Sequence, residues 1–243
     1  MPNLRAVIFD LGGTLLDFVD WDASAANKWR ASYEALATAD LAPGRPEAYI
    51  QGMRAAELAH WQRVEGEQSS GPPTGIVSEG FRSLGLEATE EQLLVALDGY
   101  ARATVGWSRL FPDTVSTLVT LRGLGYRIGL LSNTWWAAEW HNADLATHGV
   151  AALLDELVYT SDLPHSKPHP SVFLEVAGRL GVEPRDAVMV GDRMIDDISG
   201  AQSVGMRAIW RRNSATPVRA DITPDAVIET LADVPALVRA WNG

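Results

Sequence analysis

The chain has 243 residues and no cysteine, which excludes disulfide bonds and metal sites built from thiolates. It also lacks any apolar run close to the roughly 18 residues that a membrane-spanning helix needs. Its N-terminal segment, MPNLRAVIFD, does not have the charged, apolar and small stretches of a signal peptide in that order. These absences predict a soluble, cytoplasmic protein with no membrane partner.

The chain has fewer basic than acidic residues, with 20 Lys and Arg against 31 Asp and Glu and a net charge of −11. Because nucleic-acid affinity depends on a basic surface, nucleic acid is not an expected partner. A local positive charge or a bound cation still permits an anionic small molecule. Lysine is the scarcest basic residue, since Lys28 and Lys167 stand against 18 arginines. Because the chain uses arginine almost everywhere else, a lysine indicates a position where a compact point charge is useful.

Short apolar runs recur along the chain and alternate with stretches of helical spacing. The runs cover residues 4–9, 128–131, 157–160, 187–190, 208–210 and 226–228. Two helical faces lie between them, one formed by Val115, Leu118, Val119 and Leu121, the other within residues 172–180. This alternation predicts an α/β fold, a Rossmann-like parallel sheet with helices on both faces. In such sheets, ligands bind beyond the carboxyl ends of the strands.

Residues 18–110 interrupt the alternation with helical patterns and no clear strand. Residues 23–39 and 46–65 are expected to form long helices, and residues 66–75 a loop. The pattern from Thr89 to Gln92 is a capping box that starts a further helix. We therefore predict a core domain made of residues 1–17 and 111–243, and a helical cap domain of residues 18–110. Residues 212–224 form a predicted surface loop in which no chemical signal is recognised.

Four short polar segments lie at predicted strand ends. They are residues 10–14, with Asp10, Gly12, Gly13 and Thr14; Ser132 with Asn133; Lys167 before Pro168; and residues 191–197, with Asp192, Asp196 and Asp197. Taken singly, each has a structural explanation, namely an acid in a turn, a helix N-cap, a solvated lysine and an acid-rich helix start. The three carboxylates of the last segment repel one another unless a cation or a proton intervenes, and oxygen ligands of this kind suit Mg²⁺.

The order of these segments resembles the haloacid dehalogenase superfamily of hydrolases, over about residues 4–240. Asp10 to Thr14 is similar to the family's first motif, Asp-x-Asp-Gly-Thr, and Ser132-Asn133 to the second. Lys167-Pro168 is similar to the third motif, and Gly191-Asp192 with Asp197 to the fourth. The position of the insertion resembles the subgroup with a helical cap after the first motif.

This resemblance implies a Mg²⁺-dependent phosphohydrolase that acts on a small phosphorylated metabolite. Asp10 would be the nucleophile, and Lys167 would balance its charge. Asp192 and Asp197, together with Asp10 and the Gly12 carbonyl, would hold Mg²⁺. The phosphoryl group would be bound by residues of the first two motifs, which are Ser132, Asn133, Gly13 and Thr14. The oligomeric state, monomer or homodimer, is left open.

Gly12 departs from the family pattern, because the family's phosphatases usually carry a second Asp at that position. That carboxyl protonates the leaving group, a contribution of about 10²–10⁴ in rate. Asp17, Asp20 and Asp22 are the nearest candidates to replace it. Alternatively, the substrate has a leaving group that needs no acid.

Two other functions remain open. One is a weak or silent domain that binds an anion or a partner protein. The other is a metal-independent 2-haloacid dehalogenase, a branch that also lacks the second Asp but usually has an aromatic residue there. The carboxylates around Asp192 disfavour it, because they would lack a cation.

Several other residues are interpreted as structural. Trp135, Trp136 and Trp140 either line the substrate pocket or pack against the cap, and packing is favoured. For Trp21 and Trp29, a place in the pocket wall is also conceivable. The histidines are not expected to bind metal or to act in the chemistry. They are His60, His141, His148, His165 and His169. Arg193 is expected to pair with a nearby acid.

Overall fold

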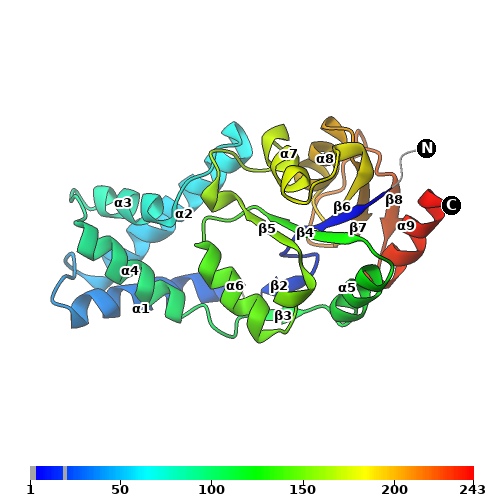
Figure 1. Ribbon diagram of the computed structural model, residues 1–243. Coiled ribbons are helices and arrows are strands. Elements are labelled where there is room, and N and C mark those ends of the chain that lie inside the picture. The colour runs from blue at the N-terminus through cyan, green and yellow to red at the C-terminus, as the bar shows by residue number, and fades with distance from the viewer. Residues whose placement is uncertain (1–3, 19–20) are drawn as a thin grey trace.

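The computed structural model describes residues 4–18 and 21–243, with side chains from residue 25 onward in the first helix. Figure 1 shows an α/β core joined to a helical cap that extends to one side. Within the described residues, no helix is long and apolar enough to cross a membrane.

The core is built on a parallel sheet whose six strands match the six predicted apolar runs. Their order across the sheet is β5-β4-β1-β6-β7-β8. The strands are β1 (Ala6–Phe9), β4 (Arg127–Ser132), β5 (Glu156–Tyr159), β6 (Ala187–Gly191), β7 (Arg207–Arg211) and β8 (Ala226–Ile228). In the centre, Phe9 of β1 lies opposite Leu130 of β4 and Val190 of β6. The carboxyl ends of these three strands therefore meet at one edge.

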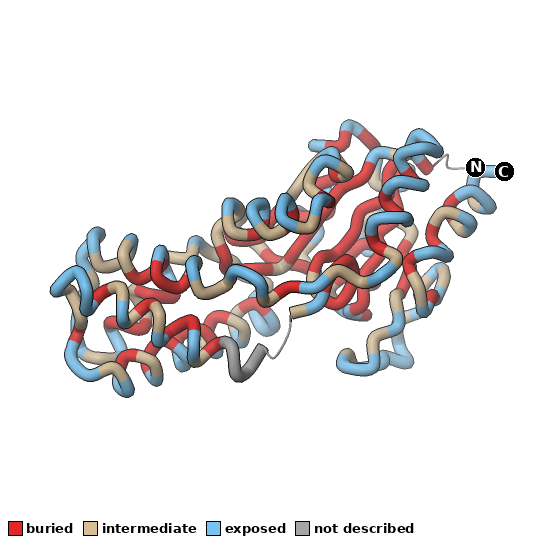
Figure 2. Tube along the Cα trace, turned by 90° about the horizontal axis from the view of Figure 1, so that it is seen from below, coloured by how far each residue is buried: buried red, intermediate tan, exposed pale blue. Residues whose placement is uncertain are grey.

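Helices cover both faces of the sheet, as predicted. The helices of the core are α5 (Thr114–Gly123), α6 (Ala138–Thr147), α7 (Pro170–Arg179), α8 (Gly200–Ser203) and α9 (Val234–Asn242). One apolar cluster packs α5, α6 and α9 against Phe9 and its neighbours, and another packs α7 and α8 against Ile8. Figure 2 shows the strands buried along their length between these layers. The Rossmann-like fold is thus confirmed.

The predicted buried face of α5 is partly wrong. Leu118 and Leu121 are buried, but Val115 and Val119 are 43% and 52% exposed. Thr114 and Thr117 take their places on the buried side. The hydroxyl of Thr114 donates to the Leu15 carbonyl at 2.6 Å, so a polar contact fixes the start of this helix where an apolar one was expected.

The cap consists of four helices around an aromatic-rich apolar cluster. They are α1 (Trp21–Thr38), α2 (Pro46–Glu67), α3 (Pro73–Ser83) and α4 (Glu90–Arg102). The capping box is confirmed, because Thr89 and Gln92 bond each other's backbone amides at the start of α4. The predicted loop 66–75 is shorter than expected, since α3 already begins at Pro73.

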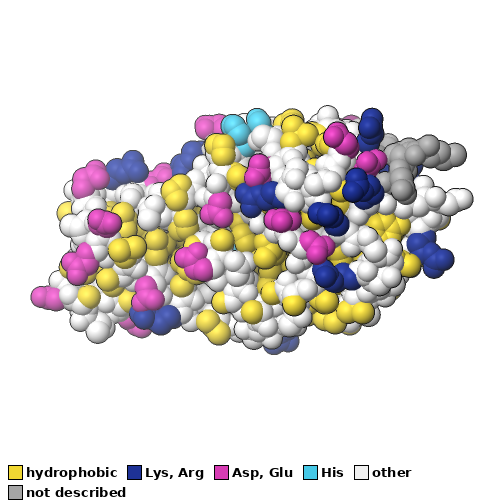
Figure 3. All heavy atoms as spheres, viewed as in Figure 1, with side chains coloured by type: hydrophobic (Ala, Val, Ile, Leu, Met, Phe, Trp, Pro, Cys, Tyr) yellow, Lys and Arg dark blue, Asp and Glu magenta, His cyan; other side chains and the backbone are white. Residues whose placement is uncertain are grey.

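Two short antiparallel strands join the cap to the core. They are β2 (Leu16–Phe18) and β3 (Ser108–Leu110), with Leu16 opposite Leu110. The expectation that residues 18–110 contain no strand is therefore wrong at both ends of the insertion. On the face shown in Figure 3, acidic side chains are spread over the cap, and basic ones are scattered among them and over the core.

Candidate active site

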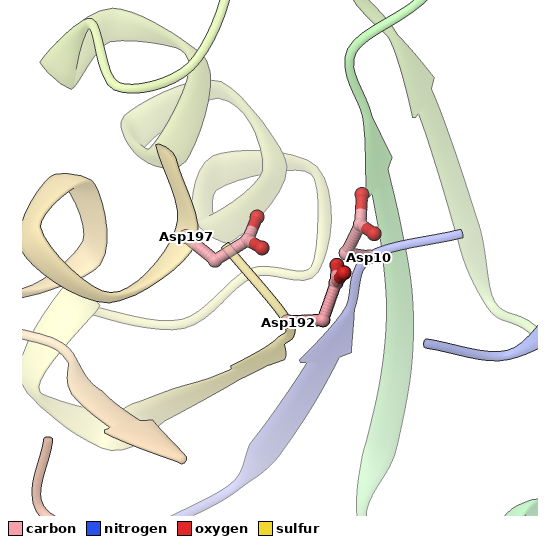
Figure 4. Close-up of side chains that lie close together, drawn as sticks. All are labelled: Asp10, Asp192 and Asp197. Carbon is pink, nitrogen blue, oxygen red and sulfur yellow. The ribbon is translucent and has the colours of Figure 1, made fainter. Parts of the chain in front are cut away.

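Three buried carboxylates meet at the edge of the sheet (Figure 4). Asp10 follows the last residue of β1, and its backbone amide donates to the Val190 carbonyl at 2.9 Å. Asp192 follows the last residue of β6, and Asp197 lies in the helical turn Met194–Ser199. One oxygen from each carboxylate lies within 4.8 Å of the other two. Residues far apart in the sequence are thus brought together by the order of the strands.

Lys167 supplies the positive charge of this cluster. Its ammonium donates to Asp10 Oδ1 and to Asp197 Oδ1, both at 2.7 Å, and to the Leu131 carbonyl at 2.9 Å. Burial alone would lower the pKa of Lys167, but the two carboxylates outweigh it and raise the pKa above its usual value. Since Lys167 is only 2% exposed, the alternative of a solvated lysine is wrong.

Asn133 holds the backbone of Lys167 in place. Its side-chain amide donates to the Lys167 carbonyl at 3.0 Å, and its Oδ1 accepts from the Lys167 amide at 2.8 Å. Neither Ser132 nor Asn133 caps a helix, because the N-cap of α6 is Ala137. The side chain of Asn133 is thus committed to the lysine, while Ser132, which is 5% exposed, lines the cavity beside Asp10.

Asp192 is positioned by the loop after β7, which was expected to have no chemical part. Asn213 donates to Asp192 Oδ2 at 2.9 Å, and the Thr216 hydroxyl donates to the Asp192 carbonyl at 3.0 Å. The sequence signal that could have found Asn213 is its place, two residues after a strand that neighbours β6. Asp192 Oδ1 is buried and has no hydrogen-bond partner among the described residues.

Gly13 and Thr14 belong to the loop after Asp10 but do not line the cavity. Gly13 has a φ of +80°, and a Cβ there would lie 2.5 Å from Asp192 Oδ2, so only glycine fits. Its amide donates to the Leu16 carbonyl at 2.8 Å. Thr14 is fully buried, and its hydroxyl has no partner within the described part of the chain. Leu11 and Gly12 are the loop residues that line the cavity beside Asp10.

A cavity of about 210 Å³ opens above Asp10, between the core and the cap. Its lining comprises Asp10, Leu11, Gly12, Phe18, Trp61, Ser132, Asn133, Thr134, Trp135, Trp136, His141, Lys167, Arg193 and Asp196. Aromatic rings form much of the wall opposite the carboxylates. The polar groups gather on the side of the sheet.

The tryptophans after β4 serve both of the roles that were considered. Trp135 and Trp136 line the cavity, and Trp135 also stacks on Trp29 of α1 with ring centroids 5.8 Å apart. Trp135 and Trp29 each donate their Nε1–H to Glu57 of α2, at 3.2 and 3.0 Å. Trp29 is buried in the cap and does not line the cavity. The side chain of Trp21 lies outside the described residues.

His141 is a cavity residue that the sequence did not reveal. Its Nε2 lies 2.9 Å from Thr134 Oγ1, and burial lowers the pKa of its imidazole to about 3. His165 and His169 stack on each other near Lys167, with ring centroids 3.8 Å apart. His148 lies 2.7 Å from the Ser108 hydroxyl, at the junction of cap and core.

Candidates for the missing acid are largely absent from the described cavity. Asp17 is exposed, and its carboxylate accepts from the neighbouring Phe18 amide at 2.9 Å. Asp20 and the side chain of Asp22 lie outside the described residues. Asp196 does line the cavity, but Arg193 Nε lies 2.7 Å from its carboxylate, which confirms that Arg193 pairs with a nearby acid.

The carboxylate cluster fits a divalent cation. Burial, together with the charge of Asp197, raises the pKa of Asp10 to about 7 and that of Asp192 to about 6, although Lys167 opposes the rise in both. The Lys167 ammonium contacts the carboxylates of Asp10 and Asp197, whereas Asp192 Oδ1 has no partner in the described structure. Mg²⁺ prefers oxygen ligands, and a bound Mg²⁺ would balance the negative charge of these carboxylates.

Comparisons with known sequences and structures assign the chain to a family. The sequence profile of the haloacid dehalogenase-like hydrolases matches residues 4–205. The chain belongs to this family of hydrolases. It is 30% identical, over 97% of each chain, to the glyceraldehyde 3-phosphate phosphatase of Methanopyrus kandleri. It is also 29% identical to phosphoglycolate phosphatase 1 of Pseudomonas aeruginosa, over 95% of this chain and 78% of that protein.

Among solved structures, a 2-haloacid dehalogenase from Pseudomonas syringae pv. Tomato DC3000 resembles this hydrolase. The two are 26% identical, with a TM-score of 0.71 over 98% of this chain and 99% of that one. A phosphatase from Thermococcus onnurineus has the same fold, with a TM-score of 0.64 over 97% of this chain and 98% of that one, at 24% identity. The cap after β1 and the parallel core are thus shared with both.

Proposed function

We propose that this hydrolase is a Mg²⁺-dependent phosphatase of a small phosphorylated metabolite, with Asp10 as the nucleophile. The observation that carries the proposal is the ion-paired cluster at the floor of the cavity. There the Lys167 ammonium donates to Asp10, and Oδ1 of the nearby Asp192 has no hydrogen-bond partner among the described residues. The names of the relatives, which are phosphatases of a triose phosphate and of phosphoglycolate, support this substrate class.

The residues that would hold Mg²⁺ are Asp10, the Gly12 carbonyl and Asp192, with Asp197 in support. Asp197 is suited to the supporting role because its two oxygens already accept from Lys167 and from the Arg193 backbone amide. When bound, Mg²⁺ supplies the positive charge that lets a carboxylate approach a phosphate dianion. Lys167 supplies further positive charge at Asp10.

Asp10 is positioned to attack the phosphorus atom of a substrate in the cavity. Lys167 holds Asp10 Oδ1, which leaves Oδ2 as the attacking oxygen. Attack forms an aspartyl-phosphate as the bond to the leaving oxygen breaks, and water then hydrolyses that intermediate. Ser132 lies in the lining where it can donate to a phosphoryl oxygen. Asn133 contributes by positioning Lys167, and Gly13 and Thr14 by ordering the loop.

The cavity volume limits the substrate. A space of about 210 Å³ accommodates a phosphoryl group with only a few further heavy atoms. Aromatic walls from Trp61, Trp135 and Trp136 surround the side where the leaving group would lie. A small phosphorylated metabolite is therefore the expected substrate.

Hydrolysis of p-nitrophenyl phosphate, with Mg²⁺ and with EDTA, tests the proposal. We expect turnover that requires the metal and that falls by at least about 10⁴-fold in Asp10→Asn, because that change removes the nucleophile. The variant should keep the Tm of the parent within a few degrees, since the amide is of the same size. Activity that survives in EDTA or in Asp10→Asn would contradict the assignment.

The same experiment separates the alternatives. A 2-haloacid dehalogenase would release chloride from 2-chloropropionate in EDTA and would leave the phosphate ester intact. A silent domain would do neither, and inorganic phosphate would then raise its Tm without any turnover. Because the chain is similar to a solved 2-haloacid dehalogenase, the experiment has to include the chloride assay.

A further inference from the structure

One face of helix α2 carries three residues that reach the core or the cavity at successive turns. Glu57, Trp61 and Glu65 are spaced four residues apart, so they lie one above another on that face. Glu57 accepts from the Trp135 indole at 3.2 Å, and Glu65 Oε1 lies 3.8 Å from Arg193 Nη2. Trp61, between them, lines the active-site cavity. Its ring is therefore directed at the active site by a segment that contacts the core on both sides of it.

Other aromatic rings continue the wall that Trp61 begins. Phe18 at the end of β2 and Trp136 after β4 line the same cavity, and their ring centroids lie 5.6 Å apart in an edge-to-face contact. Trp136 also stacks on His141, with centroids 5.2 Å apart, and His60 lies edge-on to Trp61 at 5.3 Å. Packed rings have few rotatable bonds, so they present a rigid apolar surface to a ligand.

The phosphoryl group and the rest of the substrate meet different parts of the lining. Asp10 and Ser132 lie at the floor, where the phosphoryl group is bound in the proposed reaction, so the leaving group lies against the rings. Apart from the lysine that contacts Asp10, the described lining has one further cationic side chain, Arg193. Asp196 and Glu65 already contact its guanidinium, at 2.7 and 3.8 Å. The leaving group therefore meets mainly apolar surface.

We propose that the natural substrate is the phosphate monoester of a small, uncharged and apolar alcohol, and that Trp61 selects for it. This inference rests on the proposed function and narrows its substrate class. A carboxylate or several hydroxyl groups on the leaving group would lose water against the rings without gaining comparable partners among the described residues. An alkyl or alkenyl group has no such penalty, and each carbon that leaves water favours binding.

The cavity volume sets the size of the alcohol. A cavity of about 150 Å³ with apolar walls is large enough to hold a benzene molecule. The cavity here measures about 210 Å³ and must also hold the phosphoryl group. By the same measure, the remaining space suits about four or five carbon atoms. A branched alcohol of five carbons is therefore the probe that matches the cavity.

The test compares phosphate monoesters of different alcohols, in which the same kind of bond breaks. They are 3-methylbutyl phosphate, ethyl phosphate, 2-phosphoglycolate and glyceraldehyde 3-phosphate, of which the last two appear in the names of the relatives. Phosphate release is measured with Mg²⁺, and Asp10→Asn supplies the background. We expect kcat/KM for the 3-methylbutyl ester to exceed that for the ethyl ester by about 50-fold, because each further carbon contributes about fourfold. It should exceed that for each polar ester by at least about 10-fold.

Substitutions at Trp61 locate this preference. Trp61→Ala should lower kcat/KM for the 3-methylbutyl ester by about 10-fold and change the ethyl ester by less than about twofold, because the shorter chain contacts less of the ring. Trp61→Phe keeps an aromatic ring and should retain most of the preference. Trp241→Ala is the control, since Trp241 belongs to α9 and does not line the cavity. It should leave the ratio between the two alkyl esters unchanged.

Failure of this inference and failure of the proposed function give different results. Turnover of p-nitrophenyl phosphate that requires Mg²⁺ and Asp10 supports the phosphatase assignment for any alcohol. If that turnover is present, the inference alone is overturned when a polar ester equals the 3-methylbutyl ester in kcat/KM, or when none of the alcohol esters is hydrolysed. An equal loss of both alkyl esters in Trp61→Ala also overturns it, because the ring would then have a structural role only. If p-nitrophenyl phosphate is not hydrolysed, the proposed function fails and the inference fails with it.

Discussion

The two lysines of this chain are both buried, yet their surroundings are opposite. Lys167 in the core contacts two carboxylates at 2.7 Å, which raise its pKa. Lys28 in the cap lies over the rings of Trp136 and Trp107, 4.9 and 5.8 Å from their centroids. Burial lowers its pKa to about 8, and Glu57 opposes this only in part. At Lys167 the two carboxylates therefore outweigh the penalty of burial, whereas at Lys28 burial is the larger effect.

The difference separates a chemical cluster from a structural one. The core cluster around Lys167 holds charge at Asp10, the proposed nucleophile. The cap cluster around Glu57 connects α1 and α2 to the loop after β4. Glu57 is its centre, because it accepts from Trp29 of the cap and from Trp135 of the core. Both clusters converge on residues 131–136, where Leu131 accepts from Lys167 and Trp135 donates to Glu57. Contact between the cap and the core and the placement of the ammonium thus involve the same short segment.

Removal of the core lysine should have the largest effect. In Lys167→Met, we expect kcat/KM to fall by about 10³-fold or more, because a preorganised charge at the reacting group is lost. The free energy of unfolding should fall by about 3–5 kcal/mol at pH 8, since two buried carboxylates lose their partner. Urea unfolding and p-nitrophenyl phosphate assays measure the two effects.

The pH dependence of Lys167→Met has a definite sign. Burial already raises the pKa of Asp10 in the folded state, and without the ammonium that pKa rises further above its unfolded value. Groups with a raised pKa stabilise the fold at low pH and lose that contribution as the pH rises. The variant should therefore be closer to wild type at pH 5 than at pH 8. An equal deficit at both values would show that the carboxylates do not interact as described.

Removal of the cap carboxylate should have the next largest effect, on stability. Glu57→Ala leaves the Nε1–H groups of Trp29 and Trp135 without their acceptor, so we expect a loss of about 2–4 kcal/mol. Glu57→Gln keeps an acceptor oxygen for one of them and should lose about half as much. Because Trp135 lines the cavity, KM should rise more than kcat falls in both variants. A decrease in kcat as large as that of Lys167→Met would contradict the structural role.

Removal of the cap lysine should have a smaller effect that depends on pH. The pKa of Lys28 is about 8 in the folded protein against an ordinary value of 10.5, so the unfolded chain binds more protons between these values. Stability of the wild type should therefore rise with pH over this window. Relative to Lys28→Met, the wild type should gain about 2 kcal/mol between pH 8 and pH 10.5, and thermal unfolding of the pair measures it.

The sequence predicts the core cluster better than the cap cluster, for a physical reason. Parallel strands end at one edge, so Asp10 and Asp192 could be placed together from their positions after buried runs. The cap has no such rule. The helical patterns place Trp29 in one helix and Glu57 about three turns into another, but they do not show that Glu57 accepts the indole proton of Trp29. The contact of Lys28 with the rings of Trp136 and Trp107 could not be predicted from the sequence either.

Strand order sets a second limit on what the sequence reveals. The runs at 187–190 and 208–210 were predicted as strands, but not as neighbours. Only their adjacency brings Asn213, after β7, to the Asp192 carboxylate after β6. His141 was missed for a related reason, because the direction in which α6 leaves β4 decides that it lines the cavity. The local sequence pattern thus locates the strand ends, whereas tertiary packing determines which further residues, such as Asn213 and His141, lie beside them.

The smallest predicted effect concerns Asn213, which contacts the Asp192 carboxylate. Asn213→Ala removes the donor to Asp192 Oδ2, so the carboxylate loses its fixed orientation without losing its charge. We expect the apparent affinity for Mg²⁺ to fall by about 10-fold, which is typical when a group that orients a metal ligand is removed. The rise in Tm with Mg²⁺ concentration measures this without any assay of activity.

Thr216→Val is the matched control for that change. The Thr216 hydroxyl donates to the backbone carbonyl of Asp192 and not to its carboxylate, so the loop loses a bond of similar strength. If orientation of the carboxylate matters, Thr216→Val should shift the Mg²⁺ midpoint much less than Asn213→Ala. Equal shifts would mean that the loop acts on the site by its packing alone, as the Glu57 cluster does in the cap.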